Sequence, residues 1–169
     1  NNGVEAVSGL FGKNEDVRRL DIVVAVASGD IDNSVINRRV DSFAEVSHMY
    51  TTGLCKNLIM WAWSRKPENI VFGPGTEDRI LEKAIEMGKK YSSKIPLVEG
   101  ADQRLKIARL SIATAIRLFS TEDGHNVLVT PEHVEFAVQV MLTSYDHKNL
   151  SYDVFSKQAQ KDAEFSPAE

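Results

Sequence analysis

An unbroken apolar run at residues 22–27, Ile-Val-Val-Ala-Val-Ala, constrains the fold of this 169-residue chain more than any other segment. No polar residue interrupts the apolar ones, so a strand formed here would need cover on both faces. That pattern is typical of a central strand in a parallel sheet with helices on either side. The sequence therefore predicts a buried strand at residues 22–27.

Such a strand needs neighbouring strands, and the rest of the sequence offers little for that role. The other β-branched runs, at residues 69–72 and 126–129, are each too short to flank a central strand on both sides. The first residue is Asn1 rather than Met. We therefore expect the chain to be part of a larger protein.

Helical patterns dominate the sequence after this run. Apolar periodicity predicts helices at residues 33–49, 51–66, 75–91, 101–120 and 130–142. We expect Asp32, Thr76 and Thr130 to cap the first, third and last of these, with Pro131 at the first helical position of the last. The chain is therefore predicted to be mainly α, with about five helices after one strand.

The apolar stripes of three of these helices indicate how they pack. Residues 101–120 are apolar over most of the circumference, so this helix is expected at the centre of a bundle. The residues expected to be covered are Ile80, Leu81, Ala84 and Ile85 in the third helix, Leu105, Ala108, Ile112, Ala115, Ile116 and Phe119 in the fourth, and Val134, Ala137, Val138 and Met141 in the last. From Asp146 onward the periodicity is lost, and residues 146–169 are predicted to be a linker or frayed tail.

Composition limits the class of protein. The formal net charge is −4, which does not by itself indicate nucleic-acid binding. No apolar stretch approaches the roughly 20 residues that a membrane span needs, so no membrane partner is expected. The single cysteine, Cys55, excludes an internal disulfide and is typical of a reducing compartment, so we expect a cytoplasmic location.

Common catalytic motifs are missing from the sequence. The segment around Gly12 and Lys13 is not a phosphate-binding loop, because Asn14 stands where Ser or Thr is required and Val7 where the first Gly should be. The four histidines form no HExxH motif and have no partner cysteine at metal-binding spacing, so no metal site is expected. The sequence also gives no support for a nucleophilic catalytic centre.

Three stretches nevertheless resemble a known family. They are GLFGKNEDVRRLDIVVAVASGDID at residues 9–32, RLKIARLSIATAIRLFS at 104–120 and VTPEHVEFAVQVM at 129–141. Together they resemble the end of the AAA+ ATPase core and the helical lid of MCM-type replicative helicases, particularly archaeal and MCM-related ones. The resemblance covers residues 3–145. It implies that residues 1–30 contain the last strand of an AAA+ α/β core and that residues 31–145 form the lid.

The resemblance also implies a catalytic residue ahead of the strand. In the family, a Ser-Arg-Phe-Asp element precedes the last core strand, and its arginine reaches the γ-phosphate of ATP on the neighbouring subunit. The matching residues are Arg18, Arg19, Leu20 and Asp21, which places this arginine finger at Arg19 and leaves Arg18 as the alternate. A guanidinium suits the role because it stays charged and presents a planar fork to phosphate oxygens. Paired arginines at a solvated turn, or bound to nearby acidic residues, are the simpler alternative.

A second arginine of the family, in a lid helix, senses the nucleotide. The common spacing places this role at Asp102, which is not a cation. If Asp102 caps its helix, Arg104 lies in the first turn, where unpaired N–H groups favour a phosphate. Arg104 is therefore the predicted sensor and Arg109 the alternate, expected to affect mainly stability. The simpler alternative is that Arg109 forms the polar stripe of the helix together with Lys106 and Arg117.

The implied function is part of an ATP-driven DNA helicase motor that works as a hexameric ring. ATP and Mg²⁺ would be bound by the parent protein, and the isolated chain is expected to bind neither and to be inactive. The alternatives are a non-catalytic helical module that binds DNA or a protein partner, and the lid of another AAA+ machine. Trp61 and Trp63 are expected in the core, with stacking on bases of single strands as the alternative.

Overall fold

The computed structural model describes residues 3–36 and 51–165, and the fold is mainly α-helical, as predicted. Its helices are α1 (Gly3–Phe11), α2 (Asn14–Arg18), α3 (Asn33–Ile36), α5 (Thr52–Trp63), α6 (Thr76–Lys90), α7 (Gly100–Arg117), α8 (Pro131–Tyr145) and α9 (Tyr152–Phe165). A 3₁₀ turn (Pro67–Asn69) leads into strand β1 (Ile70–Phe72), and strand β2 (Val127–Val129) precedes α8. Within the described ranges, no helix is both long enough and apolar enough to cross a membrane.

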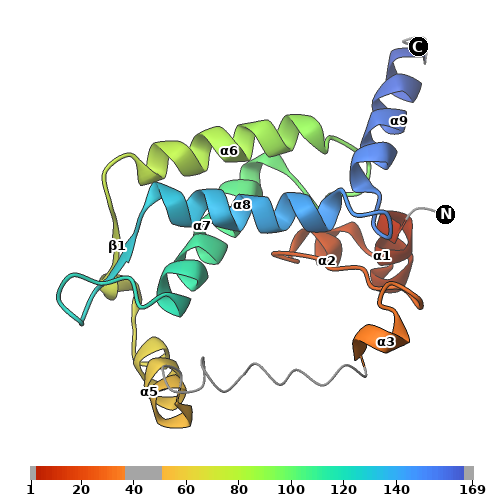
Figure 1. Ribbon diagram of the computed structural model, residues 1–169. Coiled ribbons are helices and arrows are strands. Elements are labelled where there is room, and N and C mark those ends of the chain that lie inside the picture. The colour runs from red at the N-terminus through yellow and green to blue at the C-terminus, as the bar shows by residue number, and fades with distance from the viewer. Residues whose placement is uncertain (1–2, 37–50, 166–169) are drawn as a thin grey trace.

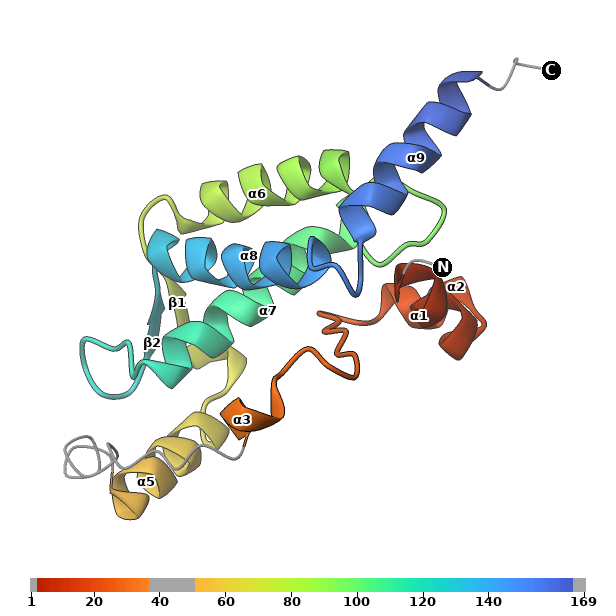
Figure 2. The ribbon, with the colours of Figure 1, turned by 45° about the vertical axis from the view of Figure 1, so that its right-hand side comes forward.

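Helices α6, α7 and α8 form the body of the molecule. Figures 1 and 2 show α6 and α8 running side by side, with α7 crossing against them. Their inward-facing side chains share one hydrophobic core, because each helix repeats apolar residues at helical spacing. The main contributors are Ile80, Ala84, Met87, Ile107, Val134, Val138 and Met141.

The predicted stripes agree with this core to different degrees. All four residues predicted for α8 are buried. In α6 the prediction is wrong for Leu81 and Ile85, which remain half exposed. The buried face of this helix includes Met87 together with Ile80 and Ala84. The prediction for the next helix is wrong for Leu105 of α7 and for Phe119, which lies beyond the end of α7; both are half exposed.

The starts of α6 and α8 test two predicted caps. Thr130 precedes α8 as predicted, and its backbone N–H donates to Nδ1 of His133 at 2.9 Å. For α6 the prediction is wrong, because Gly75 occupies the cap position with a left-handed φ of 73°, which glycine adopts readily. Thr76 is instead the first helical residue, and its buried hydroxyl donates to the carbonyl of Val129 at 3.2 Å. This bond ties α6 to β2.

The predicted strand at residues 22–27 is wrong. The segment belongs to no strand or helix, and the two short runs at residues 69–72 and 126–129 contribute strands that pair in parallel with each other. Part of the segment packs against the core of the helical body instead. Ile22, Val23 and Ala25 pack against the core while Val24 and Val26 point outward.

The expectation of an irregular tail is also wrong. Residues 152–165 form α9, whose first residue, Tyr152, is fully buried and stacks on Tyr91 at a ring-centroid distance of 5.0 Å. The chain just before α9 also holds the N-terminal helix, because the N–H of Val4 donates to the carbonyl of Leu150 at 3.1 Å. Figure 1 shows α1 beside the start of α9.

The predicted helix at residues 51–66 is confirmed as α5. Of the helix predicted at residues 33–49, the first four residues form α3, Asp32 accepts a hydrogen bond from the N–H of Ser34, and the remainder lies outside the described residues. The expectation of two core tryptophans is wrong for Trp63, which is 81% exposed. Trp61 is half-buried and packs beside β1 and β2.

The position of Ile107 predicts a large effect on stability. Ile107→Ala should lower the free energy of unfolding by about 2–5 kcal/mol, because the side chain is fully buried between helices and its loss leaves a cavity. The matched control is Val154→Ala on the exposed side of α9, which should change it by less than about 0.5 kcal/mol. Urea unfolding followed by circular dichroism measures both, and equal effects would contradict the assigned core.

Candidate functional site

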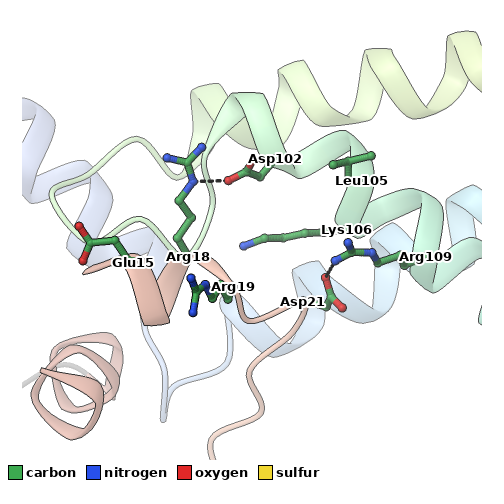
Figure 3. Close-up of a pocket in the computed structure, with 8 residues that line it drawn as sticks. All are labelled: Glu15, Arg18, Arg19, Asp21, Asp102, Leu105, Lys106 and Arg109. Carbon is green, nitrogen blue, oxygen red and sulfur yellow. Dashed lines mark hydrogen bonds and ion pairs between the residues drawn. The ribbon is translucent and has the colours of Figure 1, made fainter. Parts of the chain in front are cut away.

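A charged cleft lies between the segment around α2 and one side of α7. Its volume is about 490 Å³. Figure 3 shows the residues that line it: Glu15, Arg18, Arg19, Asp21, Asp102, Leu105, Lys106 and Arg109. Both arginines predicted ahead of the apolar run therefore lie here, although the run itself is not a strand.

A short helix and a buried valine position the two arginines. Val17 in α2 is fully buried in the main core, and Leu20 packs against the same core. Arg18 is the last residue of α2, and Arg19 is its C-cap. Because successive residues of a helix point in different directions, an anchored Val17 sends these neighbouring side chains to different places.

Arg18 turns toward the start of α7. Its Nε forms a hydrogen-bonded ion pair with Asp102, and it lies 3.1 Å from Oε2 of Glu99. The hydrogen bond from Arg18 holds the pKa of the Asp102 carboxyl below its usual value, against a smaller opposing effect of desolvation. Asp102 therefore remains ionised and fixes α2 to α7.

A second ion pair joins the same two parts of the chain farther along α7. Nη1 of Arg109 donates to Oδ1 of Asp21 at 3.0 Å. The segment that carries Arg19 is thus held to α7 on both sides, by Arg18 before it and by Asp21 after it. Dashed lines in Figure 3 mark both ion pairs.

Lys106 brings a buried cation to the same cleft. The residue is only 2% exposed, and its Nζ donates to the carbonyl of Leu97 at 2.7 Å. Burial lowers the pKa of this ammonium group, while the charges of Asp102 and Asp21 partly oppose the change. Figure 3 shows the side chain reaching from α7 toward the arginines of the α2 segment.

Arg19 is the most exposed cation of the cleft. Its side chain is 81% exposed, and its Nη1 lies 3.7 Å from Oδ1 of Asp16, which is too long for a hydrogen bond. The guanidinium at Arg19 is thus presented to solvent, whereas that of Arg18 is occupied by acidic groups of α7. The assignment of Arg19 rather than Arg18 as the residue that meets an external phosphate stays a prediction.

Arg104 does not share this cleft. It lines a separate hollow of about 360 Å³ between α6 and α7, near Glu77 and Asp78. The expected cap at Asp102 is wrong, because the N-cap is Glu99 and α7 begins at Gly100. Arg104 consequently lies beyond the first turn, and the reason for preferring it as a sensor no longer holds.

Sequence reasoning missed how Asp102, Lys106 and Arg109 act together. Their spacing of four and three residues puts them on one face of a helix, so the sequence contained a signal for a charged row. The partner of that row is the segment at residues 18–21, more than eighty positions away, which no local pattern reveals.

The cleft combines four cationic side chains, which could bind an anion, with the three carboxylates of Glu15, Asp21 and Asp102. Exposed guanidinium groups can bind phosphate oxygens, and Arg19 and Arg109 both line the cleft. Within the part of the chain that is described, no three His, Cys, Asp or Glu side chains gather to hold a metal ion. Comparison of the chain with protein-family models, curated proteins and solved structures finds no match.

The ion pair of Arg18 predicts an acid-sensitive contribution to stability. Because Arg18 lowers the pKa of Asp102 in the folded chain, the stabilisation is present above the ordinary carboxyl value of about 3.9 and is lost as the pH falls through the lowered value. Arg18→Gln should raise the pKa of Asp102 toward the ordinary value, as measured by NMR titration of the carboxyl carbon. Arg19→Gln is the matched control and should leave this pKa unchanged; an equal shift in both variants would contradict the pairing.

Proposed function

We propose that this chain is the C-terminal part of an MCM-like AAA+ motor, an ATP-dependent DNA helicase that works as a ring. The proposal combines the resemblance of residues 9–32, 104–120 and 129–141 with the charged cleft. In this role, residues 31–145 serve as the lid, and Arg19 acts as the arginine finger on ATP bound by the neighbouring subunit.

The observation that carries the proposal is the contrast between two adjacent arginines. Arg18 is bound by Asp102 and Glu99, while Arg19 stands exposed beside it. A finger must be held firmly by its backbone yet leave its guanidinium available to another subunit. Val17 and the two flanking ion pairs meet the first requirement, and the exposure of Arg19 meets the second.

In the proposed reaction, ATP and Mg²⁺ are bound by parts of the parent protein other than this chain. Residues outside this chain would hold Mg²⁺, which would supply positive charge at the phosphates. Arg19 would approach the γ-phosphate and stabilise the charge of the transition state, a contribution of about 10³–10⁵ in rate for comparable fingers. Arg109 lines the same cleft and, unlike the buried Lys106 of α7, has an exposed side chain that could act together with Arg19.

The cleft also suggests how lid movement would be linked to catalysis. Arg18 and Asp21 connect the segment carrying Arg19 to α7, and α7 packs against both α6 and α8. A displacement of α7 would therefore shift the backbone that positions Arg19. In a ring, such a link would couple nucleotide state in one subunit to lid position in the next.

The remaining features of the proposal follow from the parent ring. DNA would be the translocated partner, the subunits would form a hexamer, and the location would be cytoplasmic.

The isolated chain has no sequence able to form a phosphate-binding loop, so calorimetric titration with Mg-ATP should be nearly flat. A stoichiometric micromolar isotherm would contradict the proposal.

A second candidate function is a non-catalytic helical module that binds a macromolecular partner. The exposed apolar side chains of α5, with Trp63 the most exposed of them, favour this alternative. The lid of a different AAA+ machine is a third candidate that the same cleft would serve. The upstream sequence of the parent protein separates the binding module from the two AAA+ candidates, because only an ATPase requires a phosphate-binding loop and Mg²⁺ ligands there.

Loss of Arg19 should affect catalysis much more than folding. In the parent protein, Arg19→Ala should lower kcat for ATP hydrolysis by about 10³-fold or more, because the guanidinium acts on charge that develops in the transition state. The affinity for ATP and the thermal unfolding midpoint should change little, since the side chain is exposed. Steady-state hydrolysis, nucleotide binding and calorimetry measure these three quantities.

Mixed rings test whether the finger acts on a neighbour. Subunits with Arg19→Ala should regain part of their activity when mixed with subunits that lack only their own phosphate-binding loop. If no mixture hydrolyses ATP, action between subunits is excluded. If Arg18→Ala alone abolishes hydrolysis while Arg19→Ala is silent, the finger belongs to Arg18.

The lid arginines form a separate prediction. Because Arg109 lies in the cleft and Arg104 does not, Arg109→Ala in the parent should lower hydrolysis at least tenfold more than Arg104→Ala. Asp21→Asn is the control, because it weakens the ion pair of Arg109 while keeping the cation. Equal losses of ATP hydrolysis in Arg109→Ala and Asp21→Asn would show that Arg109 has only a structural role. A larger loss in Arg104→Ala would support Arg104 as the sensor, as the sequence predicted.

A further inference from the structure

Lys106 carries a buried amine in the charged cleft, and the proposed reaction gives that amine no role. The residue is 2% exposed, yet it lines the cleft of about 490 Å³. Figure 3 shows its side chain reaching from α7 toward Arg18 and Arg19. The amine is therefore shielded from bulk solvent while it lies at the wall of a cleft that a small molecule can enter.

The contacts of this amine differ from those of a lysine in a structural ion pair. Its hydrogen-bond partner among the described residues is the neutral carbonyl of Leu97, at 2.7 Å, and not a carboxylate. An ammonium group has three N–H donors, and this carbonyl accepts one of them. A buried cation of this kind is only partly compensated, which favours its neutral form.

The surroundings of Lys106 make the amine a better nucleophile. Burial is the largest influence, and it lowers the pKa of the ammonium group. Asp102 and Asp21 oppose the change in pKa, and Arg18 reinforces it. Only the neutral amine has a lone pair that can attack a carbonyl carbon, so a lowered pKa increases the reactive fraction near neutral pH.

Two guanidinium groups of the same cleft are available to a phosphate. The side chain of Arg19 is 81% exposed, and that of Arg109 is 63% exposed. Arg109 donates to Asp21 through Nη1, and a guanidinium has further N–H donors on its other nitrogens. Such groups bind phosphate oxygens through paired hydrogen bonds.

The carboxylates of the cleft do not remove this capacity. Asp102 is held by Arg18, and Asp21 by Arg109. Glu15 is exposed and therefore hydrated. The cleft thus combines a shielded amine with exposed phosphate-binding groups.

We propose that Lys106 is a site of Nε-acylation by small acyl phosphates that bind in the charged cleft. Arg19 and Arg109 bind the phosphate of the reagent. The acyl group lies toward the amine of Lys106, with the side chain of Leu105 as an apolar wall. The ligand class follows from this pairing, because an acyl phosphate joins an electrophilic carbonyl carbon to a phosphate.

The reaction needs no cofactor, oxidant or reductant. The neutral amine attacks the acyl carbon, and a C–N bond forms. The bond between the acyl carbon and the phosphate oxygen breaks, inorganic phosphate leaves with the electron pair, and the nitrogen loses one proton to solvent. The two guanidinium groups stabilise the charge that develops on the departing phosphate.

Acylation removes the charge of Lys106 while it preserves the contact of the side chain. The amide product keeps one N–H, which can donate to the carbonyl of Leu97 as the amine does. The connection between α7 and the loop before it is retained, and the cleft loses a cation. The proposal does not depend on ATP hydrolysis and applies equally to a non-catalytic module.

Site-resolved acetylation of the isolated chain tests the proposal. The chain is incubated with acetyl phosphate, digested, and analysed by mass spectrometry for acetylation at each lysine. Lys106 should react at least about tenfold faster than Lys66, because binding of the phosphate places the carbonyl carbon beside the amine. Lys66 is the internal reference, since its side chain is 73% exposed. Acetic anhydride carries no phosphate, so it should reverse this order.

Arginine variants test how the reagent is bound. Arg19→Gln and Arg109→Gln should each slow acetylation of Lys106 by acetyl phosphate and leave that of Lys66 unchanged. Arg117→Gln is the matched control, because Arg117 lies on the same helix but does not line the cleft. Inorganic phosphate in excess should slow the reaction of Lys106 alone, by competition for the arginines.

Three outcomes would overturn the proposal. The first is a Lys106 that acetyl phosphate leaves unmodified, as expected of a purely structural lysine. The second is a preference for Lys106 that survives in the double variant Arg19→Gln, Arg109→Gln. The third is a preference that persists when the chain is unfolded in urea, because the cleft is then absent. None of these outcomes bears on ATP hydrolysis by the parent protein, which is measured separately.

Discussion

The packing of α7 against α6 and α8 is the interaction on which the rest of the structure depends. One side of α7 is buried between the other two helices, with Ile107 fully enclosed. Gln103 is also buried there, and its amide nitrogen lies 3.5 Å from the sulfur of Met87. The opposite side of α7 carries Asp102 and Arg109, which bind the N-terminal segment. A single helix thus connects the hydrophobic core with the charged cleft.

The small sheet explains where α5 comes to lie. Strands β1 and β2 are parallel, so the chain must cross over between them, and α6 and α7 form that crossover. Val127 and Val129 are buried against Ala115 of α7, which fixes the sheet at one end of the helical body. Since α5 directly precedes β1, it is placed beyond the sheet. Its inner side there meets the loop before β2, and its outer side faces away.

Sequence patterns were informative where a helix has one apolar side, as in α8. They failed at residues 22–27, because an apolar run without alternation predicts burial but not whether strands or helices provide it. They also missed α9, because its buried residues include Tyr152 and Ser156 rather than an aliphatic stripe. Asp102 was mistaken for a cap because its true partner, Arg18, is remote in sequence.

In the cleft, apolar and charged contacts have different roles in positioning Arg19. Exposed ion pairs each contribute only about 0–1 kcal/mol, so the pairs of Arg18 and Arg109 cannot hold the α2 segment alone. Full burial of a valine side chain such as Val17 contributes about 1.5–3 kcal/mol, and Leu20 adds further apolar contact. Apolar anchoring therefore fixes the segment in place. The ion pairs then determine direction, by turning Arg18 toward α7 and leaving Arg19 to face outward.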